Sequence, residues 1–347
     1  MLPKGHEVAT GQFALPVTRR SSGSSGLTAC SFSELSTDDM LEMSSGIFVV
    51  GFERRSGWLS HLRAGESDLL LQPLRPNFWR APTDNDLGNG MNEWAALWQT
   101  ASGRLVLDNF SVQKKDKARV VNTKYLSPDF QGALEFSYTL RCDGTIRVDY
   151  ALTLSPDSGL PDLPRLGMQA VLSGDLWNLE WFGRGPHESY ADRKTSALIS
   201  RYSTDVRAQE HHYIRPQENS NRTDVRWLAL TDEQGGGLLV VGDTPLSVSA
   251  WPYLQSDIDF TSGDGSESAS GLVPVTTKHA IDVPIRDLVT VNIDHRQMGV
   301  GGDTSWGRPV HPPYRIQPGN YRYSFTLVPL IPGSEPAGKA RVIRTKE

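Results

Sequence analysis

The sequence predicts an all-β protein built as one large antiparallel sandwich. Runs of alternating apolar and polar residues are separated by turn residues about every eight to twelve positions. The 347 residues include 32 Gly and 22 Pro, which interrupt strands, and nine Trp and ten Tyr, which fit pleated surfaces. Strands and helices do not alternate regularly along the chain, so we do not expect a parallel α/β architecture.

The first part of the chain is expected to contain a lone strand, a linker and one helix. Residues 6–15 read as a strand, but a single strand is not a domain, so we expect it to close a domain that begins further upstream. The Ser/Gly composition of residues 18–26 is typical of a flexible linker. A short helix is expected at residues 92–98, with Asn89 or Asn92 as its cap.

The clearest hairpin joins residues 134–140 to residues 146–152. Its turn, Asp143-Gly144, suits the positive φ angles of a type I′ turn. Further strands are expected at residues 47–52, 58–62, 227–230, 238–241 and 321–327. We therefore divide the chain into a terminal strand remnant (1–17), a linker and lead-in (18–45), the sandwich (46–332) and a loose tail (333–347).

Charge and cysteine content narrow the classes of partner. The 35 Lys and Arg against 40 Asp and Glu give a net charge of −5, which argues against nucleic acid or an anionic membrane, because both bind basic surfaces. No run of about 18 apolar residues predicts a membrane-spanning helix. Cys30 and Cys142 are too few for a disulfide framework or a Cys-based zinc site, and we favour two free buried thiols over one bridge.

Four stretches combine aromatic rings, Arg, amides and carboxylates on a Gly/Pro frame. Sugars need this combination, because an apolar sugar face stacks on aromatic rings and the hydroxyls take paired hydrogen bonds. Most such side chains tie loops together or fill the core. Trp306 is the exception, since it follows a Gly-Val-Gly-Gly run in a loop with little scope to bury it. The stretches are residues 75–90, 181–193, 213–222 and 294–307.

Other chemistries fit the sequence less well. Residues 84–90 are similar to a calcium-binding loop, but no Glu stands at the final ligand position, so we favour a turn. His211 and His212 would diverge on a strand, which argues against a metal site. Residues 299–302 do not open a βαβ unit, and there is no Gly-x-Ser-x-Gly nucleophile elbow.

Together, the four stretches resemble the C-terminal region of bacterial β-galactosidases of glycoside hydrolase family two. The resemblance covers roughly residues 46–332, and residues 2–16 resemble the closing strand of the immunoglobulin-like domain that precedes this region. It implies a supersandwich of the galactose-mutarotase-like kind. It also implies that the two catalytic glutamates belong to an (α/β)₈ barrel that this chain lacks, so we expect the isolated chain to be inactive.

The resemblance also implies roles for single residues. Trp306 matches the tryptophan that forms the platform for the non-galactose part of the substrate, and Asp303 lies on the same loop. Asp86, Gly88 and Asn89 match the start of a mobile loop that borders the same pocket. No residue of this chain is expected to be catalytic or to bind a metal.

The implied partners are galactosides, the catalytic barrel portion or large subunit of the same enzyme, and further copies in the full enzyme. No cofactor is expected in this chain, although the family commonly uses Mg and Na bound elsewhere. Nothing in the sequence distinguishes a cytoplasmic from a periplasmic location.

Two alternative functions stay open. A stand-alone epimerase of the aldose mutarotase kind would use a histidine and a carboxylate as acid and base on a sugar ring. A binding or assembly module would have no chemistry at all. A sugar groove in the sandwich itself would draw on Arg165, His187, Glu188, Glu218, Asn219 and His295.

Overall fold

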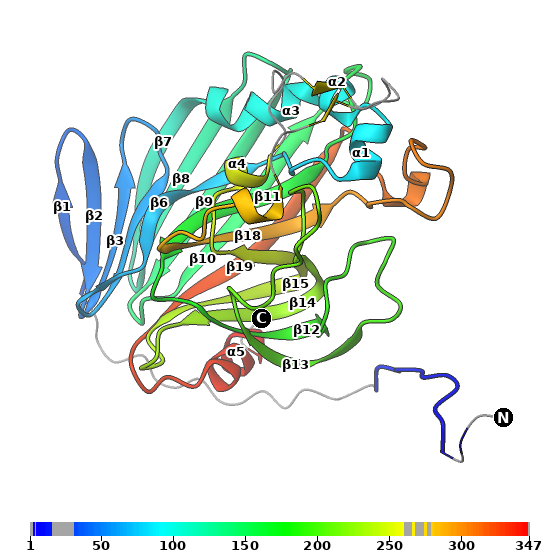
Figure 1. The fold of residues 1–347 in the computed structure, drawn as a ribbon. Helices are drawn as coiled ribbons and strands as arrows, with labels where there is room; N and C mark the ends of the chain where they lie inside the picture. The colour runs from blue at the N-terminus through cyan, green and yellow to red at the C-terminus, as the bar shows by residue number, and fades with distance from the viewer. Residues whose placement is uncertain are drawn as a thin grey trace.

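Antiparallel strands make up most of the computed structural model, which describes residues 3, 5–15, 31–259, 266–267, 274–275 and 279–345 (Figure 1). The strands are β1 (Ser33–Ser36), β2 (Met40–Ser45), β3 (Phe48–Glu53), β4 (Leu59–Ala64), β5 (Ser67–Asp68), β6 (Leu70–Asn77), β7 (Val106–Lys115), β8 (Ala118–Leu126), β9 (Gly132–Arg141), β10 (Ile146–Leu154), β11 (Arg165–Ser173), β12 (Asn178–Gly185), β13 (Leu198–Asp205), β14 (Arg222–Thr231), β15 (Gly237–Trp251), β16 (Ser266–Glu267), β17 (Pro274–Val275), β18 (Leu288–Gln297) and β19 (Asn320–Leu330). The helices are α1 (Asp84–Gly88), α2 (Met91–Trp94), α3 (Ala96–Ala101), α4 (Gln255–Ile258) and α5 (Pro336–Thr345). Single 3₁₀ turns span Ser102–Arg104, Ala280–Asp282 and Pro312–Tyr314.

Every strand pairing in the described part of the chain is antiparallel, which confirms the predicted all-β antiparallel class. The long strand β15 connects two parts of the sheet, because its two halves pair with different strands. Residues 237–242 pair with β19, which continues into the curved sheet of β10, β9, β8 and β7. Residues 247–251 pair with β18, which continues into β11 and β6 (Figure 1).

The main core lies between the sheet of β2–β6 and the curved sheet of β7–β10. Aromatic side chains meet across this space. Phe52 of β3 contacts Tyr138 of β9 edge to face at a centroid distance of 5.1 Å, and Trp58 stacks on Tyr125 of β8 at 4.1 Å. Burial of each such ring stabilises the fold by about 1.5–3 kcal/mol, so this packing fixes the two sheets against each other.

The predicted hairpin is confirmed, but its turn differs from the expected type. The strands pair through Leu140 opposite Ile146. Three residues separate Arg141 from Thr145, and only Gly144 among them has positive φ, at +80°. A type I′ turn needs two such residues, so the turn is the longer kind in which one glycine takes the left-handed position.

The predicted helix at residues 92–98 is divided into α2 and α3. Neither Asn89 nor Asn92 caps it; α2 instead begins after Gly90, which has φ of +77°. Residues 84–88, which we expected to form a turn, form the short helix α1. Its first turn is closed by a capping box between Thr83 and Asp86.

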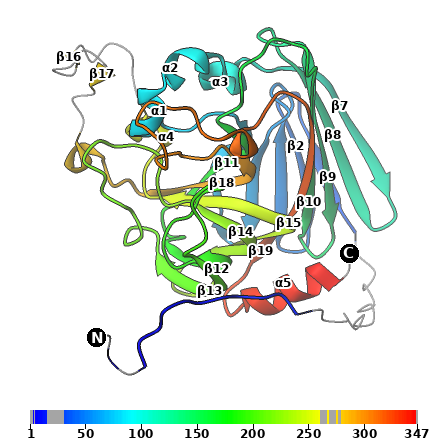
Figure 2. The ribbon, with the colours of Figure 1, turned by 90° about the vertical axis from the view of Figure 1, so that its right-hand side faces the viewer.

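Both ends of the chain differ from the expected division. β1 pairs with β2, and β2 pairs with β3, so the sheet begins before residue 46. The expected loose tail contains α5 instead, because Ala337, Ala340 and Ile343 pack on the apolar outer side of β14 and β15 (Figure 2).

Residues 5–15 are exposed and form no strand in the described structure, although Gln12 exchanges two hydrogen bonds with the backbone of Ile199. Whether they close an upstream domain stays a prediction. The predicted linker, residues 18–26, lies outside the described residues. The expectation of free thiols is wrong for Cys142, a residue of the hairpin turn, because its sulfur is disulfide-bonded. Cys30 lies outside the described residues.

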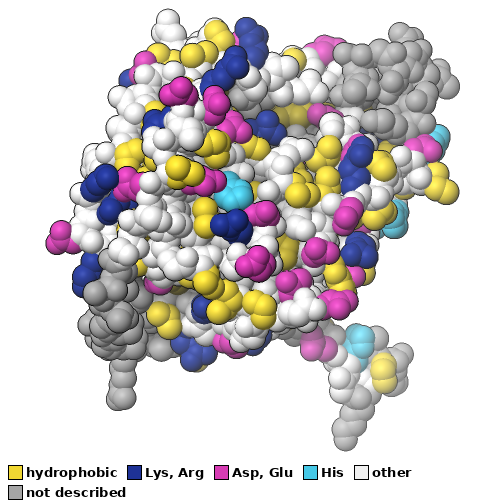
Figure 3. Space-filling model, turned by 90° about the vertical axis from the view of Figure 1, so that its left-hand side faces the viewer, with side chains coloured by type: hydrophobic (Ala, Val, Ile, Leu, Met, Phe, Trp, Pro, Cys, Tyr) yellow, Lys and Arg dark blue, Asp and Glu magenta, His cyan; other side chains and the backbone are white. Residues whose placement is uncertain are grey.

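The surface mixes both signs of charge. On the face shown in Figure 3, acidic and basic side chains are interspersed rather than gathered into one patch. None of the helices in the described ranges is long and apolar enough to cross a membrane.

We predict that Gly144→Ala destabilises the protein more than Gly65→Ala. Both glycines have positive φ, but a Cβ at Gly144 would lie 2.5 Å from the Phe48 ring, whereas one at Gly65 would meet nothing within 4 Å. The free energy of unfolding should fall by about 2–4 kcal/mol for Gly144→Ala and by about 1 kcal/mol for Gly65→Ala. Urea unfolding measures both, and equal losses would contradict the close contact with Phe48.

Candidate functional site

Two loops that we expected to bear on the substrate meet at one end of the molecule, where the segment around α1 lies beside the loop that follows β18 (Figure 1). Trp306 packs directly on the backbone of Gly88, since a Cβ at Gly88 would lie 2.9 Å from the indole Cε2. The tryptophan is 52% exposed, as expected for a contact residue. Glycine therefore provides the close support that leaves the indole open to solvent.

A fully buried guanidinium, that of Arg80, connects these loops. Its Nε and Nη2 donate to the two carboxylate oxygens of Asp86 at 3.0 and 2.8 Å. Its Nη1 donates to the carbonyl of Met298, and Nη2 donates to the carbonyl of Gly299 at 2.8 Å. We call residues 298–307, which follow β18, the Trp306 loop. Arg80 thus fixes α1 to the start of this loop with charge-assisted hydrogen bonds.

The next residues of the Trp306 loop are held by α1 itself and by one further segment. Asn85 donates to the carbonyl of Val300 at 3.0 Å. Asp192 accepts from the amides of Val300 and Gly301 at 3.0 and 2.7 Å. Residues 298–301 are therefore fixed on both sides, whereas residues 302–306 are exposed.

The other residues predicted at this site have different surroundings. Asp86 is buried in its pair with Arg80, so it positions the loop and has no exposed oxygen for a ligand. Asn89 accepts a hydrogen bond from the indole of Trp94 at 3.0 Å. Asp303 is exposed and lies 2.9 Å from Nε2 of His311.

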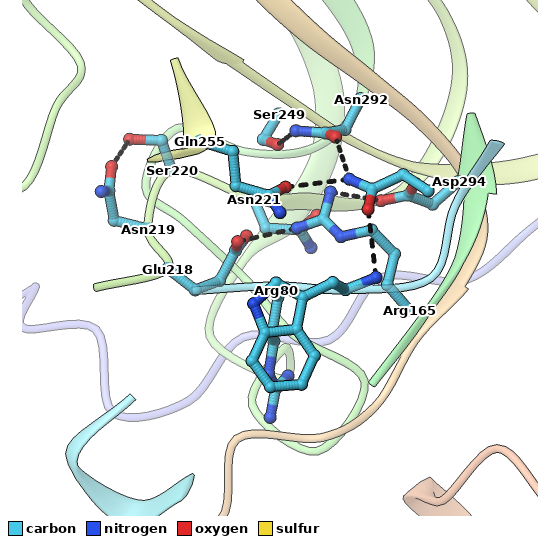
Figure 4. A network of polar contacts seen from close by, with 12 residues as sticks. Arg80, Arg165, Glu218, Asn219, Ser220, Asn221, Ser249, Gln255, Asn292 and Asp294 are labelled. Carbon is cyan, nitrogen blue, oxygen red and sulfur yellow. Dashed lines mark hydrogen bonds and ion pairs between the residues drawn. The ribbon is translucent and has the colours of Figure 1, made fainter. Parts of the chain in front are cut away.

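The predicted groove residues Arg165, Glu218 and Asn219 lie in the interior (Figure 4). Arg165 donates to Glu218 at 2.7 Å and to Asp294 at 3.0 Å, and all three side chains are fully buried. Asn219 donates to the hydroxyl of Tyr253 at 2.9 Å. One guanidinium therefore serves two buried carboxylates.

Burial dominates the ionisation of this group. It raises the pKa of Glu218 and raises that of Asp294 to about 8, against the attraction of Arg165. The negative charge of Glu218 adds to the rise in the pKa of Asp294. Asp294 is consequently protonated in the folded protein over most of the neutral range.

The remaining groove candidates do not form an acid–base pair. Glu188 accepts from the hydroxyl of Tyr213 at 2.6 Å and from the amide of Ser220 at 2.9 Å. His187 is exposed, and its Nδ1 lies 2.8 Å from the carbonyl oxygen of Glu188 rather than from a carboxylate. His295 packs on the ring of a buried tyrosine, Tyr323, and burial lowers its pKa to about 4.

Sequence reasoning missed Arg80, Asp192 and Asp294 as members of these networks. All three lie in the aromatic-rich stretches, but each has a partner more than 100 residues away in the sequence: Met298 for Arg80, Val300 for Asp192 and Arg165 for Asp294. Among the described residues, no group of three or more His, Cys, Asp or Glu side chains is arranged to hold a metal ion.

Comparisons with known proteins agree with the resemblance found in the sequence. A profile of the family described as "Beta galactosidase small chain" matches residues 44–327. The β-galactosidase of Priestia megaterium is 33% identical over 94% of this chain and 30% of its own length. That of Lactobacillus delbrueckii subsp. bulgaricus is 31% identical over 80% of this chain and 26% of its own length. The chain thus spans less than a third of the curated relatives that it matches.

Two epimerases are among the solved structures that the chain matches in part. Galactose 1-epimerase from Lactobacillus acidophilus is 10% identical, with a TM-score of 0.43, and covers 86% of this chain and 97% of its own. A putative aldose 1-epimerase from Escherichia coli K12 is also 10% identical, with a TM-score of 0.41, and covers 86% of this chain and 98% of its own.

We predict that Asp192→Ala releases the start of the Trp306 loop. The amides of Val300 and Gly301 lose their acceptors, so their hydrogen exchange should accelerate by about tenfold or more. Asp192→Asn should preserve one amide's protection, because it keeps one acceptor oxygen. Asn85→Ala is the control, since it removes a donor to the same loop and leaves both amides bonded to Asp192. Unchanged exchange in Asp192→Ala would contradict the role of Asp192 in holding the loop.

The raised pKa of Asp294 predicts a pH dependence of stability. The unfolded aspartate has a pKa of about 3.9, so between roughly pH 4 and pH 8 the folded state holds more protons than the unfolded state. This group's contribution to stability is present in full below pH 4 and is lost as the pH rises through about 8.

Urea unfolding of the parent chain and of Asp294→Asn at several pH values tests this prediction. The difference in unfolding free energy should move in favour of the variant as the pH rises from 5 to about 8.5, because asparagine does not titrate. A difference that stays constant over this range would contradict the shift.

Proposed function

Because the chain belongs to the β-galactosidase small-chain family, we propose that it is the non-catalytic C-terminal part of a larger β-galactosidase, which hydrolyses terminal β-D-galactose residues. In this proposal the chain completes the substrate pocket of a catalytic barrel and takes part in assembly. Its similarity to only 26–30% of the length of these relatives supports a larger partner region. Isolated, the chain does not hydrolyse galactosides.

The observation that carries the proposal is the supported but open indole of Trp306. Aromatic rings provide the apolar surface on which sugar rings stack, and a ring held in one position loses little entropy on binding. Gly88 fixes the position of the indole, and Arg80 fixes the two loops that carry these residues. We propose that the indole contacts the non-galactose part of the substrate.

The architecture supports a division of labour. The strand pairings in the described ranges are antiparallel, whereas an (α/β)₈ barrel needs parallel strands with helices between them. The deepest carboxylates, Glu218 and Asp294, are paired with Arg165 rather than facing each other across an open cleft. In a glycosidase the two catalytic carboxylates flank the glycosidic bond, and these two do not, so we assign hydrolysis to the partner region.

We predict that Trp306→Ala raises the KM of the assembled enzyme for a galactoside by about tenfold, equivalent to ~1.4 kcal/mol of lost binding. The measurement is hydrolysis of a chromogenic galactoside by the complete enzyme that contains this chain. Phe182→Ala is the matched control, because Phe182 is also an exposed aromatic residue but lies on β12.

Two outcomes would contradict the proposal in different ways. Turnover by the purified 347-residue chain alone would show that catalysis does not need a partner. Unchanged kinetics in Trp306→Ala would show that the indole is not a substrate platform.

A further inference from the structure

A second concave site lies beside the Trp306 loop. A pocket of about 450 Å³ is lined by residues that lie within four segments, 83–85, 190–193, 213–218 and 300–303. This volume falls within the range of about 300–1,000 Å³ that is typical of small-molecule sites. Residues 300–303 of the Trp306 loop line the pocket, but Trp306 itself does not.

Two lining residues have buried polar atoms without a hydrogen-bond partner. Tyr190 and Glu218 are each only 2% exposed, and the Tyr190 hydroxyl and Oε1 of Glu218 are both unpartnered. The other oxygen of Glu218 accepts from Arg165. Leaving such groups unpaired costs about 1–3 kcal/mol each, so their presence in one pocket points to a ligand that completes them.

The protonation of these two groups defines what they need. Burial and the nearby carboxylates of Glu188 and Glu218 raise the pKa of Tyr190 well above its usual value, so its hydroxyl stays a donor. Burial also raises the pKa of the Glu218 carboxyl, whereas Arg165 and the side-chain amide of Gln297 act to lower it. The Gln297 amide makes no hydrogen bond of ordinary geometry with this carboxyl group. The pocket lining therefore includes a phenol donor and a carboxyl oxygen that has no hydrogen-bond partner.

The other carboxylates of the pocket already have partners. Asp84 accepts from Arg215 at 2.8 Å and from Gln217 at 3.0 Å. Asp192 accepts from two backbone amides of the Trp306 loop. Internal hydrogen bonds thus compensate much of the acidic charge, and the pocket does not depend on an external cation for this purpose.

We propose that this pocket binds a neutral sugar or polyol through Tyr190 and Glu218. A hydroxyl group both accepts and donates, so neighbouring hydroxyls of one ligand satisfy the Tyr190 hydroxyl and Oε1 of Glu218 together. An ammonium or guanidinium group only donates, so it would satisfy Oε1 of Glu218 and leave the Tyr190 hydroxyl without an acceptor. The ring of Tyr213 also lines the pocket and offers an apolar surface to a sugar ring.

Calorimetric titration of the 347-residue chain with D-galactose tests the proposal. We expect saturable binding that Tyr190→Phe weakens by about tenfold. The variant should fold normally, because it removes a hydroxyl that has no protein partner and keeps the ring. Trp306→Ala should leave this binding unchanged, which separates the pocket from the proposed indole platform.

Three results would overturn the pocket assignment. The first is the absence of saturable galactose binding by a chain whose thermal unfolding is cooperative. The second is binding that Trp306→Ala abolishes and Tyr190→Phe leaves intact, which would support the platform instead. The third is tighter binding of arginine amide than of galactose, with the same dependence on Tyr190, which would identify a socket for a basic side chain.

Discussion

The guanidinium of Arg80 is the contact on which the geometry of the candidate site depends. It lies fully buried between Asp86, which closes the first turn of α1, and the carbonyls of Met298 and Gly299, which begin the Trp306 loop. Removing one partner from such a buried pair typically costs about 3–5 kcal/mol, because a charge stays behind without compensation. The pair therefore specifies one arrangement of two loops that are more than 200 residues apart in the sequence.

The sheets position this contact. Arg80 follows β6, and Met298 follows β18, and both strands pair with β11. Their ends therefore reach the same edge of the molecule, where the loops meet. Because β15 pairs with β18 through one half and with β19 through the other, the same edge is also tied to the large curved sheet and its aromatic core. A rigid antiparallel framework thus supports a short, exposed loop whose tip carries the indole.

Local patterns were sufficient where the structure depends on neighbours in the sequence. Alternation in residues 134–152 predicts the hairpin, and the glycine run before Trp306 predicts an exposed loop; both are confirmed. Patterns failed where distant contacts decide. The tail forms α5 because the outer side of β14 and β15 offers an apolar surface, and residues 33–45 form strands because β3 is available for pairing.

For the site, the sequence by itself determined which chemistry is present: an indole in a glycine-rich loop, carboxylates, amides and guanidinium groups in four stretches. Only the tertiary structure decided how they are used. It pairs Asp86 with Arg80, and Glu218 with Arg165, whereas Trp306 and Asp303 stay exposed. The reason is physical: a buried charge needs a compensating partner within hydrogen-bond distance, and the partner's identity depends on which strands lie side by side, which no local pattern specifies.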